Sequence, residues 1–209
     1  MLIDTAGMRR KARVKENLEY YGVNRAVKSI KRSQIVVLVI SADDFFTHQD
    51  KTILSLILRY GKGCVIVVNK WDLIRKTSRT QDEFKERIKV EFPSAAHIPV
   101  LFVSALKNLR VSKILPAAIE VYKEYTKRIP THEFNKFIYE IVNTYSPPQK
   151  GGRVRIYYGT QAETAPPLFV LFTNKPEVIK ENYRKFLINK IREKYGFNGV
   201  PILLKFRHK

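Results

Sequence analysis

The segment Val65–Val68 constrains the fold most. Four consecutive apolar, β-branched residues are typical of a strand that is buried on both faces of a parallel sheet. This segment runs directly into Asn69, Lys70, Trp71 and Asp72. In an open parallel sheet, ligands bind beyond the carboxyl ends of the strands. The sequence therefore places four polar or aromatic residues where a ligand would bind.

The residue types in this segment suit guanine. The carboxylate of Asp72 can accept two hydrogen bonds, from the ring N1–H and the exocyclic amine, whereas adenine has no donor at N1. A polar site of this kind can reject the wrong base by roughly 10⁴-fold or more. The amide of Asn69 can hold the loop and reach the other edge of the base, and the stem of Lys70 can cover the ring. Asn and Asp after a strand also form ordinary turns, so the segment alone is a moderate signal.

Two further segments follow predicted strands in the same way. Asp4-Thr5-Ala6-Gly7 follows Leu2-Ile3, and Ser104-Ala105-Leu106 follows Pro99–Val103. The order Asp-x-x-Gly, Asn-Lys-x-Asp, Ser-Ala resembles a translational-type GTPase domain. This resemblance implies that Asp4 holds Mg²⁺ through water, that the Gly7 amide meets the γ-phosphate and that the Ala105 amide meets the guanine oxygen. The predicted nucleotide-binding residues are Asp4, Thr5, Ala6, Gly7, Met8, Asn69, Lys70, Trp71, Asp72, Ser104, Ala105 and Leu106.

Strands and helices alternate along the first part of the chain, which favours an α/β architecture. Strands are expected at Ile35–Ile40, Cys64–Asn69 and Pro99–Ser104. Capping boxes are expected at Thr47 with Asp50 and at Thr80 with Glu83. A later helix is expected to carry Leu115, Ala118, Ile119 and Tyr122 and to run to about Arg128. From about Ile129 the pattern changes to helix, strand, strand, helix, strand. We therefore expect two domains, residues 1–129 and residues 130–209.

Four segments together identify a family resemblance: Asp4–Lys11, Val67–Asp72, Ser104–Leu106 and Arg128–Thr131. They resemble the Der (EngA) family of bacterial ribosome-assembly GTPases. The Era family is a near rival, but it usually has Asp-Thr-Pro-Gly at the first motif and lacks the Ile-Pro-Thr junction. The resemblance implies an incomplete P-loop GTPase-type parallel sheet with helices on both faces, followed by a small α+β KH-like domain. The chain would correspond to a C-terminal fragment, with most of the second GTPase domain and the KH-like domain.

The phosphate-binding motif of such GTPases does not occur in this sequence. No Gly-x-x-x-x-Gly-Lys-Ser/Thr is present, and Gly61-Lys62 continues into Gly63-Cys64, which does not match. If these residues were the whole molecule, the sheet would have an open slot beside unpaired strand edges. Met8 stands where many GTPases place a water-positioning Gln. The resemblance implies K⁺-assisted hydrolysis of GTP to GDP in intact members. We predict no catalytic residue here and no measurable hydrolysis by this chain alone.

The charge balance points to a polyanionic partner. Lys and Arg number 39 against 19 Asp and Glu, which gives a formal net charge of +20 and favours nucleic acid; a Lys-rich soluble surface is the alternative. The predicted RNA-binding residues are Arg9, Arg10, Lys11, Arg13, Lys15, Lys150, Arg153 and Arg155, near Tyr157 and Tyr158.

Gly196–Gly199 has the Gly-x-x-G form, but a helix stop and a turn explain it better. The single cysteine, Cys64, is expected to be a buried apolar residue in a reducing compartment.

Three functions remain open from the sequence. The chain is part of a GTP-binding GTPase of large-subunit ribosome assembly, or a basic KH-like module that binds RNA or the ribosome without catalysis, or the non-functional product of a truncated reading frame. The expected partners are guanine nucleotide and ribosomal RNA. The sequence lacks both a signal pattern and a membrane-length apolar run, so we expect a cytoplasmic protein. The chain is also expected to be a monomer.

Overall fold

The computed structural model describes residues 26–147 and 153–209, apart from positions 76 and 78. The chain forms two compact units, which divide after Tyr122 and therefore within helix α4 (Ile114–Thr126). The predicted boundary between residues 129 and 130 lies a few residues further along the chain and stays a prediction. None of the helices in the described part is long and apolar enough to cross a membrane.

The first unit is built on a parallel sheet in the order β1 (Ile35–Ser41), β2 (Gly63–Asn69) and β3 (Val100–Phe102). Leu38 lies opposite Ile66, and Ile66 lies opposite Val100 in the next strand. Every residue of the central strand β2 except Asn69 is buried. The apolar run therefore forms the buried central strand that its composition predicts, which confirms the parallel α/β sheet.

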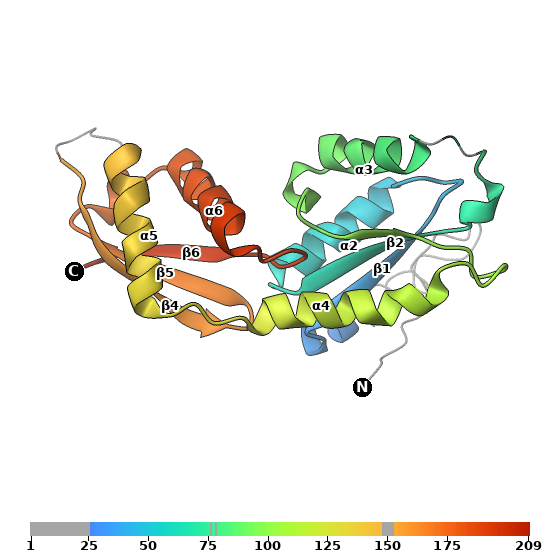
Figure 1. The fold of residues 1–209 in the computed structure, drawn as a ribbon, viewed down its shortest axis with the longest axis horizontal. Helices are drawn as coiled ribbons and strands as arrows, with labels where there is room; N and C mark the ends of the chain where they lie inside the picture. Colours follow the sequence, from blue (N-terminus) through green and yellow to red (C-terminus); the bar gives the residue numbers. More distant parts are fainter. Residues whose placement is uncertain (1–25, 76, 78, 148–152) are drawn as a thin grey trace, which may run out of the picture. The chain divides into compact units, whose positions relative to one another are not determined.

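Helices cover both faces of this sheet (Figure 1). Helices α2 (His48–Arg59) and α3 (Thr80–Glu91) lie on one side, and α4 lies on the other. Leu54, Ile57 and Ile88 are the innermost helix residues of the core, at no more than 1% exposed. Alternate residues of β2 thus face helices on opposite sides, as the burial of the whole strand requires.

The starts of two helices differ in how well the sequence predicted them. Helix α2 has the expected capping box, because the N–H of Asp50 donates to Thr47 Oγ1 at 3.3 Å and the N–H of Thr47 donates to Asp50 Oδ2 at 2.9 Å. The capping box predicted at Thr80 is wrong. Thr80 is the first helical residue of α3, and its Oγ1 accepts from the N–H of Thr77 at 2.8 Å, so it closes the preceding turn instead.

Helix α4 carries the apolar residues expected of it, but most of them are not covered. Leu115, Ile119 and Tyr122 are 66%, 46% and 42% exposed, whereas Val121 is 3% exposed. The helix has apolar residues around much of its circumference. Spacing alone therefore identifies residues that share a face but does not identify which face is covered.

The second unit contains α5 (Thr131–Thr144), β4 (Ile156–Thr164), β5 (Pro167–Thr173), α6 (Glu181–Tyr195) and β6 (Leu203–His208). Strand β5 is central, antiparallel to β4 and parallel to β6. The predicted order of elements is therefore confirmed. Helix α6 begins at Glu181, after a separate short 3-10 turn at Pro176–Val178.

Candidate functional site

A pocket of about 270 Å³ opens at the carboxyl ends of β2 and β3. It is lined by Asn69, Lys70, Asp72, Leu73 and Leu106. Four of these five residues belong to the predicted nucleotide-binding set, and Leu73 was not predicted. The structure thus brings the Asn-Lys-x-Asp and Ser-Ala segments to one hollow, at the edge of the sheet where parallel strands leave a ligand site.

Backbone geometry sets the direction of the chain as it leaves β2. Lys70 has φ 61° and ψ 31°, a left-handed conformation that is uncommon for a residue with a side chain. The chain then enters a short 3-10 turn, Trp71–Leu73, closed by the N–H of Leu73 donating to the carbonyl of Lys70 at 3.0 Å. This reversal holds the half-buried Asp72 beside the strand end. Such strained residues cluster at functional sites.

The loop after β3 is tied to the loop after β2. The N–H of Ala105 donates to Asn69 Oδ1 at 3.0 Å. Ser104 is fully buried, and its Oγ accepts from the N–H of Lys107 at 3.1 Å. The role expected of Asn69 in holding the loop is therefore present. The Ala105 amide that the resemblance assigns to the guanine oxygen donates to Asn69 in this structure.

Lys70 also has a partner that the sequence did not predict. Its Nζ lies 2.8 Å from Asp43 Oδ2, and Ser41 Oγ donates to the other oxygen of the same carboxylate. The hydrogen bond from Lys70, and then that from Ser41, hold the pKa of Asp43 well below its usual range. Asp43 follows the end of β1, so the rule that identified the other two loops applied to it as well.

Trp71 contributes differently from its neighbours. Its side chain is 2% exposed and packs against Phe84 and Phe102, with ring centroids 5.0 and 4.4 Å apart. It therefore anchors the loop in the core and can face the pocket only through its backbone. Leu106, by contrast, is 87% exposed at the rim.

Several predicted site residues lie outside the described part of the chain. These are Asp4, Thr5, Ala6, Gly7, Met8, Arg9, Arg10, Lys11, Arg13, Lys15 and Lys150. Within the described part, no group of His, Cys, Asp or Glu residues is arranged to hold a metal ion. The magnesium role of Asp4 therefore stays a prediction.

The Gly-x-x-G segment forms a structural turn. Gly196 ends α6 with φ 87°, and Phe197 is fully buried. The N–H of Phe197 donates to Glu124 Oε2 at 2.5 Å, and Arg192 Nη2 donates to the carbonyl of Val200 at 3.0 Å. These contacts fix the loop from within, which agrees with its interpretation as a helix stop and a turn.

The two parts of the chain match two families. Residues 22–124 match the elongation factor Tu GTP binding domain, and residues 128–207 match the KH-domain-like family of EngA bacterial GTPase enzymes, C-terminal. A solved structure of Era in complex with MgGDPNP and 16S ribosomal RNA is a more distant match, at 17% identity and a TM-score of 0.47 over 99% of this chain and 74% of that chain.

Relatives resemble the whole chain more closely. GTPase Der of Natranaerobius thermophilus is 43% identical over 210 residues, and GTPase Der of Fusobacterium nucleatum is 44% identical over 211 residues. Each alignment covers 100% of this chain and 48% of the relative. The chain thus spans about half the length of these curated relatives, and it belongs to the Der (EngA) family of bacterial GTPases.

Proposed function

We propose that this chain recognises guanine nucleotide through the pocket at the ends of β2 and β3, as part of a GTPase of large-subunit ribosome assembly. The observation that supports this most is the tie between Asn69 and Ala105, because it joins the two loops that carry the recognition residues. The pocket beside this tie includes Asp72. The relatives bear the name GTPase, which agrees with the proposal.

Each side chain has a distinct part in this recognition. The Asp72 carboxylate accepts from guanine N1–H and the exocyclic amine. Because Asn69 Oδ1 holds the Ala105 loop, its Nδ2 is the atom left to donate to the opposite edge of the base. Lys70, placed by its ion pair with Asp43, covers the ring with its stem. Phosphate, Mg²⁺ and K⁺ binding belong to the proposed activity of the intact enzyme.

Titration of the isotopically labelled chain with guanosine tests base recognition without relying on phosphate contacts. Affinity for the base alone is expected in the millimolar range, about −4 kcal/mol. NMR shift changes are expected at the amides of Asn69–Leu73 and Ser104–Leu106, with no such changes on adding adenosine.

Replacing Asp72 provides the sharpest specificity control. Asp72→Asn turns one acceptor into a donor, so guanosine shifts should vanish and xanthosine shifts should appear. Asp82→Asn makes the same chemical change on the exposed surface of α3 and should leave the guanosine response intact. If guanosine shifts survive in Asp72→Asn, the assignment of guanine to this pocket is wrong.

A second function is favoured by the positive surface of the second unit. Arg153 and Arg155 are both exposed, directly before β4, as the RNA prediction requires. Binding of ribosomal RNA by this unit is compatible with nucleotide binding by the first. Co-sedimentation with the large ribosomal subunit over a salt series tests it, since phosphate contacts require weaker binding at higher salt.

A further inference from the structure

The loop that follows β1 is joined to the loop that carries Asn69. Ser41, the last residue of β1, lies opposite Asn69 in β2, and the N–H of Ala42 donates to the carbonyl of Asn69 at 2.9 Å. Asp43 comes next in the chain, and it is not among the residues that line the pocket at the ends of β2 and β3. Any effect of Asp43 on a ligand in that pocket must therefore act through another side chain.

The carboxylate of Asp43 joins β1 to Lys70. Its Oδ1 accepts from Ser41 Oγ and from the N–H of Asp44, the latter at 3.1 Å, and its Oδ2 lies 2.8 Å from Lys70 Nζ. One oxygen thus fixes the carboxylate to its own loop, and the other holds the ammonium group. The side chains of Lys70 and Asp43 are 47% and 40% exposed, and an ion pair this exposed contributes little to stability. The position that it gives to Lys70 is the more important consequence.

The loop itself is held firmly beyond Asp43. Phe46 is 3% exposed and has φ 52°, a conformation that is uncommon for a residue with a side chain. The ring of Phe45 meets that of Phe84 edge-on, with centroids 4.6 Å apart. The capping box of α2 follows directly. Because β1 fixes one end of the loop and this packing fixes the other, the carboxylate stays in place and Lys70 adapts to it.

Lys70 has the side chain whose freedom matters for a ligand. It lines the pocket, and its long stem would otherwise sample many rotamers. A side chain that is ordered only when a ligand arrives weakens binding by the entropy it then loses. The ion pair restricts these rotamers in the empty pocket, so the wall is formed before the base enters.

We propose that Asp43 is a positioning residue for guanine recognition, which acts by holding the stem of Lys70 along one wall of the pocket. The proposal rests on the guanine-binding function proposed above. It gives the loop after β1 a part in the site, alongside the loops after β2 and β3. Asp43 touches no atom of the base in this arrangement.

Titration of the labelled full chain with guanosine tests the proposal. Asp43→Asn should weaken guanosine binding about 2- to 10-fold, the effect expected for one side chain that must be ordered on binding. Asp43→Glu keeps the charge and should retain more of the affinity. Guanosine is uncharged, so salt should affect its binding mainly through the ion pair. Raising the salt from about 0.05 M to about 1 M should weaken binding to the parent and have little effect on Asp43→Asn. A purely structural role would not produce this difference.

Lys70→Met shows whether Asp43 acts through Lys70. Methionine keeps an apolar stem but lacks the ammonium group, so this variant should also bind guanosine more weakly and lose the salt dependence. The double variant with Asp43→Asn should bind within about 2-fold of Lys70→Met alone, because both changes break one interaction. Asp82→Asn is the matched control. It breaks an exposed ion pair with Lys85 on α3, 3.2 Å long, and should change neither affinity nor salt dependence.

The outcomes separate this proposal from the one on which it rests. Absence of any guanosine response in the parent would overturn both. A parent response that Asp43→Asn leaves unchanged in affinity and in salt dependence would overturn only the role of Asp43. Losses that multiply in the double variant would do the same, since Asp43 would then act independently of Lys70. A loss of helical circular dichroism in Asp43→Asn would assign the residue to stability and also overturn the proposal.

Discussion

The side-chain oxygen of Asn69 accepts a hydrogen bond from the backbone N–H of Ala105 at 3.0 Å, across 36 residues of sequence. This bond makes the loop after β2 and the loop after β3 one structural unit. Loop positions in the pocket therefore depend on a side chain that also belongs to the proposed recognition set. Stability and base binding can be separated by choosing which atom of Asn69 is removed.

Asn69→Ala should destabilise the first unit by about 0.5–1.5 kcal/mol, because the Ala105 N–H loses its partner at an exposed site. It should also abolish the guanosine response. Asn69→Asp keeps the acceptor and removes the amide donor, so it should keep more of the stability while still losing base binding. Urea unfolding followed by the fluorescence of Trp71, the single tryptophan, measures the stability of this unit. Equal stability of the parent and the alanine variant would contradict the structural role of the bond.

The strand ends could be predicted from sequence for a physical reason. A continuous run such as Val65–Val68 has no polar face, so it fits only the buried centre of a parallel sheet, and its end fixes where polar residues lie. The partner of Lys70 was missed because Asp43 follows a different strand. That ion pair depends on β1 and β2 being neighbours, which local pattern does not specify.

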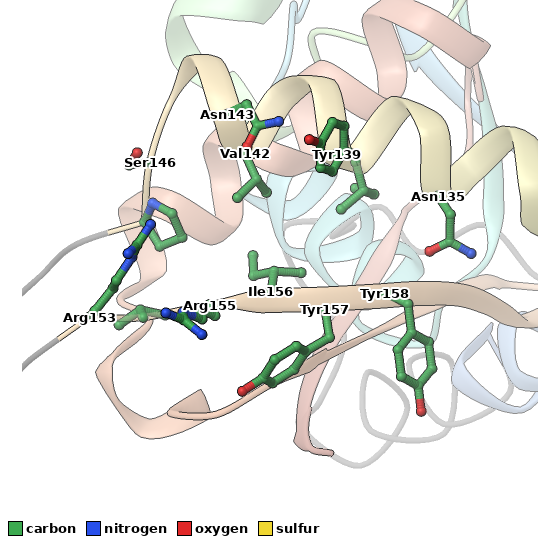
Figure 2. Close-up of a pocket in the computed structure, with 13 residues that line it drawn as sticks. Asn135, Tyr139, Val142, Asn143, Ser146, Arg153, Arg155, Ile156, Tyr157 and Tyr158 are labelled. Carbon is green, nitrogen blue, oxygen red and sulfur yellow. The ribbon is translucent and has the colours of Figure 1, made fainter.

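Other features could not be predicted from the sequence because they depend on tertiary contacts. Regular alternation would place Tyr157 and Tyr158 on opposite faces of β4, but the register shift at Tyr157 breaks it. Thr80 has the spacing of a capping residue, yet the turn at Thr77 uses its hydroxyl. Asn135, Tyr139 and Asn143 of α5 line the same pocket as Arg153, although they are far from it in sequence (Figure 2). Only packing of α5 against β4 brings them together.

Cys64 should be almost unreactive in the folded protein. The residue is fully buried, and burial raises the pKa of its thiol to about 12 from an ordinary 9.0. Because the thiolate is the reactive form, labelling with a thiol reagent at pH 8 should be slow and should accelerate in urea along with the loss of Trp71 burial. Rapid labelling in native buffer would show that β2 opens locally.

The same thiol makes stability fall at alkaline pH. The folded state keeps the thiol proton to a higher pH than the unfolded state does. The stability that this difference contributes is therefore fully present below pH 9 and is lost as pH rises toward 12. The loss attributable to Cys64 should approach about 1.4 kcal/mol per pH unit in that range. The comparison is with Cys64→Ala, which lacks the ionisable group; identical pH profiles for the two proteins would contradict this account.

Gln161 should be essential to the second unit. It is 1% exposed, its Oε1 accepts from the N–H of Ile129 at 2.8 Å, and its Nε2 donates to the carbonyl of Lys127 at 2.8 Å. Gln161→Leu leaves both backbone groups without this partner and should cost at least about 2 kcal/mol. Thermal unfolding followed by circular dichroism, with hydrogen exchange at β4 to localise the change, measures the loss.

Gln161→Glu is the informative companion variant. Its carboxyl group can donate to the Lys127 carbonyl only when protonated, so burial and this bond should raise its folded pKa above the ordinary value of about 4.3. A raised pKa gives stability that is present at low pH and lost as pH rises. The variant should therefore be closer to the parent near pH 4 than at pH 7. A pH-independent difference would show that the Lys127 bond contributes little.

Gly159 should not tolerate a side chain, because helix α5 packs directly over it. A Cβ at this position would lie 2.4 Å from Leu171 Cδ2 and 2.8 Å from Phe134 Cε1, and both of those side chains are fully buried. Gly159→Ala should cost about 1–3 kcal/mol through overpacking. Leu171→Ala alone should cost about 2–5 kcal/mol by leaving a cavity. In the double variant the new methyl group occupies part of that cavity, so the combined loss should be smaller than the sum by at least about 0.5 kcal/mol. Additive losses would mean that the sheet shifts to accept the methyl group, and that close packing of α5 on β4 does not depend on glycine.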